Sequence, residues 1–171
     1  MHDPTLVLYT DSSPNGFKIT IALEEMGLPE SAAILLYLAQ LSGQLLAPQP
    51  QPRWAAITWL MYHSASMGPL LGQRVHFECF EATPCPAAIQ RYRHLTESTF
   101  ATLDQHLATR PWLAGEAYSI ADIATFAWLH IAALVGFDFS SHSHLNRWYR
   151  QVDQHPAVQR GLRLPAPATG P

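Results

Sequence analysis

The sequence of 171 residues predicts a predominantly helical protein with a small α/β part at its N-terminus. Three observations lead to this fold class. A short strand runs directly into a capped helix near the start of the chain. The second half carries apolar stripes at helical spacing, and within it one capped helix is apolar on every side. Apolar residues make up 48% of the chain and charged residues 13%, which is typical of a globular protein with one core or two small ones.

The clearest helix start lies at Ser119, whose hydroxyl is placed to cap the following backbone N–H groups. Asp122, three residues later, is placed to reach back to the Ser119 N–H, so the pair predicts a capping box with Asp in place of Glu or Gln. Tyr118 and Ile123 could form the flanking hydrophobic staple. Residues 123–136 are apolar on every face, which predicts a core helix. A membrane span is the alternative, but the run is shorter than the roughly 20 residues a bilayer requires.

The N-terminal part begins with residues 5–10, which are β-branched and apolar and predict a buried strand. Ser13 is placed to cap the next helix, Pro14 suits its first position, and Gly27 ends it. A strand that feeds a helix N-terminus leaves free N–H groups at a positive dipole end, which favour an anion such as a thiolate. A plain capped helix without a ligand fits the same pattern.

A further helix is predicted over residues 30–39, with Ser31 as its cap and Gly43 near its end. It is apolar nearly all round, so it is expected to be buried. Its N-terminus could hold a carboxylate ligand, again because of the helix dipole. Residues 44–53 are polar and rich in proline, and they predict the boundary between two domains.

The rest of the chain predicts helices only. The first covers residues 54–67, and Gly68-Pro69 is expected to bend or end it. The others are indicated by an apolar stripe between Ile89 and Leu107, by the capped helix from Ser119, and by Leu145, Trp148 and Val152 ahead of His155-Pro156. The residues after Leu164 are predicted to be disordered.

Composition also narrows the classes of partner. A formal charge of −3 argues against nucleic acid or a membrane as the main partner. The N-terminus shows no signal-peptide pattern, and Cys79 and Cys85, the two cysteines, match no zinc or redox spacing. These features predict a cytoplasmic protein. His142 and His144 have no Cys or carboxylate partner at ligand spacing, so no metal is predicted.

Five stretches of sequence together resemble glutathione transferases, in the branch of the bacterial nu-class enzymes and the yeast Ure2-like proteins. The motifs are Tyr9-Thr-x-x-Ser13-Pro14-Asn15-Gly16-x-Lys18, Glu30-Ser31-x-Ala-Ile34-Leu-Leu-Tyr-Leu38, Gly68-Pro-Leu-Leu-Gly72-Gln73-x-x-His76-Phe77, Ser119-Ile-Ala-Asp122 and His155-Pro-Ala-Val-Gln-Arg-Gly-Leu162.

This resemblance implies a glutathione transferase-like fold, in which a thioredoxin-like α/β domain is followed by an all-α helical domain. The implied domains are residues 1–43 for glutathione binding, 44–53 as linker, 54–164 as the helical domain and 165–171 as a disordered tail. The resemblance also implies a homodimer, glutathione as co-substrate, and a small apolar electrophile or a disulfide as second substrate.

The resemblance further implies roles for individual residues. Ser13 and Asn15 match the catalytic positions that donate hydrogen bonds to the glutathione sulfur, which would favour its thiolate form. Glu30 and Ser31 match the positions that hold the γ-glutamyl group. The second-substrate pocket is expected to include Met67, His76 and Trp128, for which plain core or structural roles are the alternative.

One departure from the family pattern is large. Typical element lengths place roughly forty residues, with a strand, a helix and a hairpin, between the positions of Pro29 and Glu30. Here Gly27-Leu-Pro-Glu30 runs directly into Ser31, without the intervening segment. All but one strand of the implied sheet is therefore missing from the sequence. Either residues of the natural chain are absent from this sequence, or the protein is truly trimmed at this point.

Two classes of function follow. The first is a glutathione-dependent transferase, including a disulfide-bond oxidoreductase, that acts through a glutathione thiolate at a helix N-terminus. The alternative is a protein of the same fold without that activity. It would be a binding or regulatory protein, or a small-molecule biosynthetic enzyme that does not use glutathione.

Overall fold

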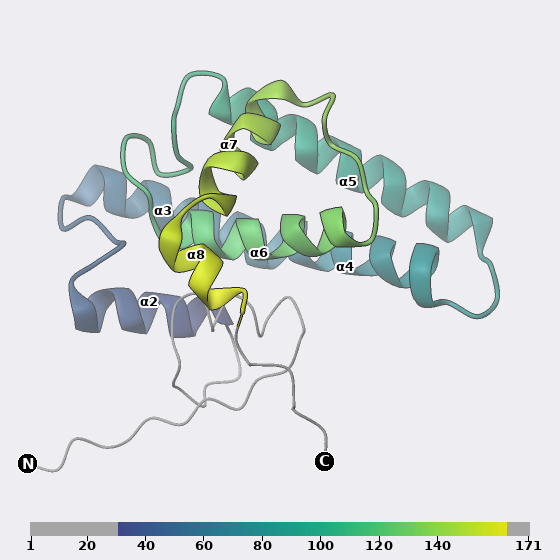
Figure 1. Ribbon diagram of the computed structural model, residues 1–171, viewed down its shortest axis with the longest axis horizontal. Helices are drawn as coiled ribbons and strands as arrows, with labels where there is room; N and C mark the ends of the chain where they lie inside the picture. The colour runs from purple at the N-terminus through teal and green to yellow at the C-terminus, as the bar shows by residue number, and fades with distance from the viewer. Residues whose placement is uncertain (1–30, 164–171) are drawn as a thin grey trace, which may run out of the picture.

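A computed structural model of the protein describes residues 31–163, which form helices throughout (Figure 1). In chain order these are α2 (Ser31–Ser42), α3 (Pro50–Tyr62), η1 (His63–Met67), α4 (Gly68–Val75), η2 (His76–Phe80), α5 (Pro86–Leu107), α6 (Ile120–Leu134), α7 (Ser143–Asp153) and α8 (Pro156–Gly161). The predicted all-helical part is confirmed.

The thioredoxin-like part is not established, because most of it falls outside the described residues. The predicted strand over residues 5–10, the helix after Ser13, the Glu30–Ser31 junction and the tail 165–171 all lie wholly or partly there. Within residues 31–163 the only β pairing is an isolated bridge between Trp112 and Gly115.

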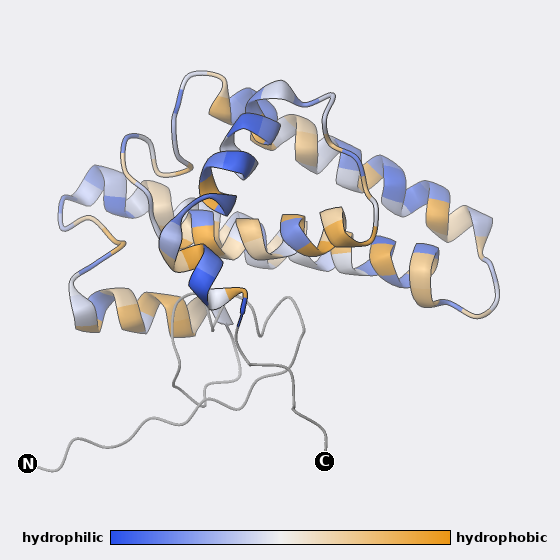
Figure 2. Cartoon of the chain, viewed as in Figure 1, coloured by the Kyte–Doolittle hydropathy of each residue, from blue (hydrophilic) through white to orange (hydrophobic). Residues whose placement is uncertain are grey.

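Helix α6 lies at the centre of the bundle and contacts α2, α3, η1, α4 and α7 (Figure 1). Ten of its residues are buried: Ile120, Ala121, Asp122, Ile123, Ala124, Thr125, Phe126, Ala127, Leu129 and Ala132. This confirms the prediction of a core helix up to Ala132, whereas Leu134 in the last turn is 66% exposed. Figure 2 shows α6 as mainly hydrophobic along its length, whereas α7 is mainly hydrophilic on the visible side. Nowhere in residues 31–163 does a helix combine the length and apolar character needed to cross a lipid bilayer.

The N-terminus of α6 has the predicted capping box. The Ser119 hydroxyl accepts a hydrogen bond from the Ala121 N–H at 3.3 Å, and Asp122 Oδ2 accepts from the Ser119 N–H and hydroxyl at 2.9 Å each. Asp122 Oδ1 accepts from the Leu113 N–H at 2.9 Å and from Trp148 Nε1 at 2.8 Å. Burial raises the pKa of the Asp122 carboxyl against the lowering effect of these hydrogen bonds. One carboxyl therefore joins α6, the preceding loop and α7.

The helix predicted over residues 54–67 begins earlier and continues further than expected. Pro50 lies in the first turn of α3, where its missing N–H has no cost, and helical structure then runs through η1, α4 and η2. Pro69 does not end it, because η1 is a wide π-helical turn in which the Gly68 N–H donates to the His63 carbonyl. Such a turn re-sets the hydrogen-bond register around a proline ring that would otherwise clash.

The helices bury two adjoining hydrophobic clusters. The larger one joins α4, α5, α6 and α7 and contains Phe100, Leu103, Leu107, Phe126 and Trp148. The smaller one joins α2, α3 and the first turns of α6. The predicted stripe of α5 is confirmed by buried Phe100, Leu103 and Leu107, and that of α7 by buried Leu145, Trp148 and Val152.

Helix α2 differs from its prediction on one side. Ala32, Ile34, Leu35 and Ala39 are buried, but Tyr37 is 51% exposed and Leu41 66% exposed. The expectation of burial on all faces is therefore wrong for the described residues. Apolar composition alone did not distinguish the two faces, because both carry large apolar side chains. The helix ends where predicted, with Gly43 in the left-handed region at φ +68°.

Candidate functional site

Four of the seven residues predicted for the site lie in the described part of the chain. Ser13, Asn15 and Glu30 fall outside it. Ser31 is the first described residue of α2 and is buried.

Trp128 of α6 lies against two glycines of α4. A Cβ atom added at Gly72 would be 2.9 Å from Trp128 Cη2, and one added at Gly68 would be 3.3 Å from Trp128 Nε1. The indole therefore extends along α4 on a surface that only glycine leaves open. This packing was not predicted from the sequence, although the four-residue spacing of the glycines is its signal.

Met67 and His76 lie on either side of these glycines along the chain. Met67 is 1% exposed and belongs to the larger core cluster, together with Leu71 and Phe100. His76 follows Gly72 by four residues, so it continues the same side of the helix that Trp128 covers. Its side chain is half exposed, and Nε2 lies 3.1 Å from Glu81 Oε2. The spacing thus puts His76 on the side of the helix that Trp128 covers, and the structure places Met67 in the core.

A charged network holds η2 against α5. Glu78 accepts from Arg74 Nε at 2.8 Å and from Arg93 Nε and Nη2 at 3.0 and 2.9 Å. Arg74 also donates to Thr96 Oγ1 at 3.0 Å. Burial raises the pKa of Glu78, but the hydrogen bonds and positive charges of Arg93 and Arg74 outweigh it. The pKa therefore lies below its ordinary value. The network fixes the segment that carries His76.

A second polar pair connects α6 to α7. His130 Nδ1 lies 3.1 Å from the Tyr149 hydroxyl, and the two rings are roughly parallel. Burial lowers the pKa of His130, while burial and the nearby Asp153 charge raise the pKa of Tyr149 to about 12. Both side chains are therefore uncharged at neutral pH.

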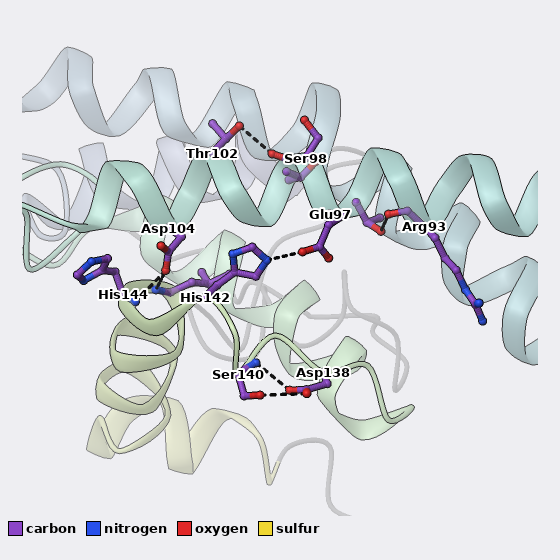
Figure 3. Close-up of polar contacts among 12 residues, drawn as sticks. Arg93, Glu97, Ser98, Thr102, Asp104, Asp138, Ser140, His142 and His144 are labelled. Carbon is purple, nitrogen blue, oxygen red and sulfur yellow. Dashed lines mark hydrogen bonds and ion pairs between the residues drawn. The ribbon is translucent and has the colours of Figure 1, made fainter.

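The two histidines at 142 and 144 do not converge. Figure 3 shows the His142 ring directed toward Glu97, with Nε2 2.7 Å from Oε1, and the His144 ring directed away from it. Asp104 Oδ1 accepts from the backbone N–H groups of His144 and Leu145 and so caps the start of α7. The described residues contain no cluster of three or more His, Cys, Asp or Glu side chains suited to a metal ion.

Comparison with known proteins gives consistent matches. The family described as "Glutathione S-transferase, C-terminal domain" matches residues 86–151. The disulfide-bond oxidoreductase YfcG of Escherichia coli is 36% identical over 139 residues, which are 81% of this chain and 65% of YfcG. A Pseudomonas putida glutathione transferase, crystallised with one glutathione disulfide per subunit, superposes with a TM-score of 0.84 at 30% identity and covers 96% of this chain and 93% of its own.

A more distant relative contains sequence that has no counterpart in this chain. Ure2 of Candida albicans is 22% identical over 236 aligned positions, which include 89% of this chain and 67% of Ure2. The alignment is longer than the 171 residues of this chain, so part of Ure2 has no counterpart here. The chain likewise spans slightly less than two thirds of YfcG.

Proposed function

Because the chain belongs to the glutathione transferase superfamily, in its Ure2-like branch, we propose that it binds glutathione and catalyses glutathione-dependent disulfide exchange. The observation that carries the proposal is the similarity over 96% of the chain to a transferase crystallised with glutathione disulfide. The similarity to YfcG, named a disulfide-bond oxidoreductase, supports the reaction type.

In the proposed reaction the thiolate of one glutathione attacks a disulfide of the substrate. A mixed disulfide forms and one substrate thiolate leaves. A second glutathione thiolate then attacks the glutathione sulfur of the mixed disulfide, which forms glutathione disulfide and releases the second substrate thiolate. Two glutathione molecules are oxidised and one disulfide is reduced, so electrons balance without another cofactor.

The proposal assigns Ser13 and Asn15 to stabilising the glutathione thiolate, and Glu30 and Ser31 to holding the γ-glutamyl group. A small apolar electrophile or disulfide would bind beside Trp128 and His76. Met67 would not contact the second substrate. Its buried side chain would instead support the η1 turn that precedes Gly68.

The direct test is a turnover assay with reduced glutathione and bis(2-hydroxyethyl) disulfide, in which the release of glutathione disulfide is measured. Ser13→Ala should lower kcat/KM by at least about tenfold, since a hydrogen bond to a charged group contributes about 1.5–3 kcal/mol. Ser12→Ala is the matched control and should leave kcat/KM unchanged. Equal activity of the two variants would contradict the role of Ser13.

The source of the sulfur is tested separately. Cys79 and Cys85 are the only cysteines of the chain, and both are exposed and free. If glutathione supplies the thiolate, the double variant Cys79→Ser, Cys85→Ser keeps its activity. Loss of turnover in that variant would assign the chemistry to the protein thiols instead.

A second candidate function follows from the alignment with Ure2. Part of Ure2 has no counterpart here, and a glutathione-binding part that lacked a segment would leave the glutathione site incomplete. A protein trimmed in this way would act without catalysis, as a regulatory or ligand-binding protein, or in biosynthesis without glutathione. A folded wild-type chain without turnover and without glutathione binding would support this second function.

We further propose a cytoplasmic homodimer. The exposed face of α3 carries Trp54, 65% exposed, and Met61, 43% exposed, seven residues apart on one side of the helix. The molar mass from light scattering on a size-exclusion column tests the dimer. Trp54→Asp should convert the dimer to a monomer, whereas Leu134→Asp, which changes an equally exposed leucine of α6, should not.

A further inference from the structure

A groove of about 710 Å³ lies between the α2–α3 connection, the first turns of α3 and the loop before α6. Its size falls within the range of roughly 300–1,000 Å³ that small-molecule sites occupy. Leu46, Pro48, Pro52, Ala55, Ala114 and Tyr118 give it a mainly apolar lining. Of the residues assigned to the proposed function, those that the structure describes, Ser31, Met67, His76 and Trp128, do not line the groove.

The groove is a fixed feature of the fold. Leu45 has φ +61°, a left-handed conformation that a leucine rarely adopts, and its carbonyl accepts the Ile120 N–H at 3.0 Å. Leu46 beside it is buried in the smaller core cluster. The surrounding contacts therefore hold the strained loop in place against the start of α6.

Tyr118 lines the groove and connects it to the core. Its ring stacks on His155 at 4.8 Å and meets Trp112 edge to face at 5.0 Å. The hydroxyl is buried and has no hydrogen-bond partner within the described part of the chain. The lining thus joins an apolar surface to an unpaired buried polar group.

The charges at the groove limit what can bind. The N–H groups of the first turn of α6 are already used, since Ile120 donates to Leu45, and Ala121, Asp122 and Ile123 donate to Ser119. That helix end therefore offers no anion site. Among the described lining residues Arg110 is the only cation. Its Nη1 makes only long contacts, at 3.3 Å to the His106 carbonyl and 3.4 Å to Thr109 Oγ1.

We propose that this groove binds a small amphipathic carboxylate, with its apolar body on the Leu46–Tyr118 surface and its carboxylate on Arg110. A guanidinium matches a carboxylate with two parallel hydrogen bonds, which gives the site an orientation as well as attraction. Among the described lining residues Glu116 is the only acidic one, and its side chain is exposed to solvent.

The test uses octanoate as the probe and the amide NMR signals of Gly43 and Gly115, which both line the groove. Octanoate should shift these signals saturably, and neutral 1-octanol should bind more weakly. Arg110→Gln should weaken octanoate binding about tenfold or more. Arg91→Gln, which removes an exposed arginine of α5, is the matched control and should have no effect.

A second pair of variants tests the apolar part. Ala117 is exposed and lines the groove, so Ala117→Phe should fill it and abolish the shifts at Gly43 and Gly115 without unfolding the protein. Ala101→Phe on the exposed face of α5 should leave binding intact. Reduced glutathione should not displace octanoate. Absence of saturable shifts in the wild type, or unchanged binding in both Arg110→Gln and Ala117→Phe, would overturn the proposal.

Discussion

Gly68 and Gly72 show how single atoms position the candidate site. The absence of a Cβ at these positions lets the Trp128 indole lie directly on α4. A glycine inside a helix destabilises it by about 1 kcal/mol relative to alanine. The close approach of Trp128 explains why glycine is nevertheless suited to these two positions.

This packing predicts that Gly72→Ala changes the free energy of unfolding in opposite directions with and without the Trp128 indole. Gly72→Ala should destabilise the wild type, because overpacking of about 1–3 kcal/mol exceeds the gain of about 1 kcal/mol in helix propensity. In a Trp128→Ala background the same substitution should stabilise the protein by about 1 kcal/mol. Urea unfolding of the four proteins measures both effects. Stabilisation by Gly72→Ala in both backgrounds would show that the indole does not lie on Gly72.

Tyr118 gives a second prediction at the scale of one residue. Its hydroxyl is buried without a partner among residues 31–163, and burial, with a smaller effect of Asp122, raises its pKa. An unsatisfied buried polar group costs about 1–3 kcal/mol. Tyr118→Phe keeps the ring contacts to His155 and Trp112 and should raise the free energy of unfolding by up to that amount. A lower melting temperature of the variant would mean that the hydroxyl has a partner.

The helices α4 and η2 are held on α5 by the carboxylate of Glu78. Its pKa is lower in the folded protein than in the unfolded chain, so its contribution to stability is present above the unfolded pKa. That contribution is lost as the pH falls through the folded pKa, because the unfolded state then binds the proton more readily. The network is thus expected to weaken below about pH 4.5.

The corresponding prediction compares two glutamine variants. Wild-type stability should fall as the pH is lowered from 5 to 3, and Glu78→Gln should show a shallower fall and lower stability at pH 7. Glu116→Gln removes an exposed carboxylate and should retain the wild-type slope. Melting temperatures of the wild type and both variants, measured at several pH values between 3 and 7, test this prediction. If the melting temperature of Glu78→Gln fell with pH as steeply as that of the wild type, Glu78 would not contribute to the loss of stability in acid.

The helices themselves were largely predictable. Ser119 and Asp122 fixed the start of α6 by their spacing, and the stripes of α5 and α7 matched the buried faces. The continuation of α3 past Pro69 was not predictable, because a π-helical turn depends on local packing that no residue pattern marks. The exposed side of α2 was missed because it too carries large side chains with apolar surface, Tyr37 and Leu41.

For the molecule as a whole, sequence motifs identified the superfamily and the helical domain. They could not place Trp128 on the two glycines, since that contact joins helices about sixty residues apart in the chain. They also located the departure beside Glu30, at the start of the second glutathione-contact motif, where the family pattern has a longer segment.

The most direct test of the central proposal is calorimetric titration of reduced, and then oxidised, glutathione into the 171-residue chain. We predict saturable binding with a dissociation constant between micromolar and millimolar, weakened at least about tenfold in Ser13→Ala and unchanged in Ser12→Ala. Octanoate held at the Arg110 groove should not alter this result. A well-folded chain that binds neither form of glutathione would contradict the proposed function and favour a protein of this fold that acts without glutathione.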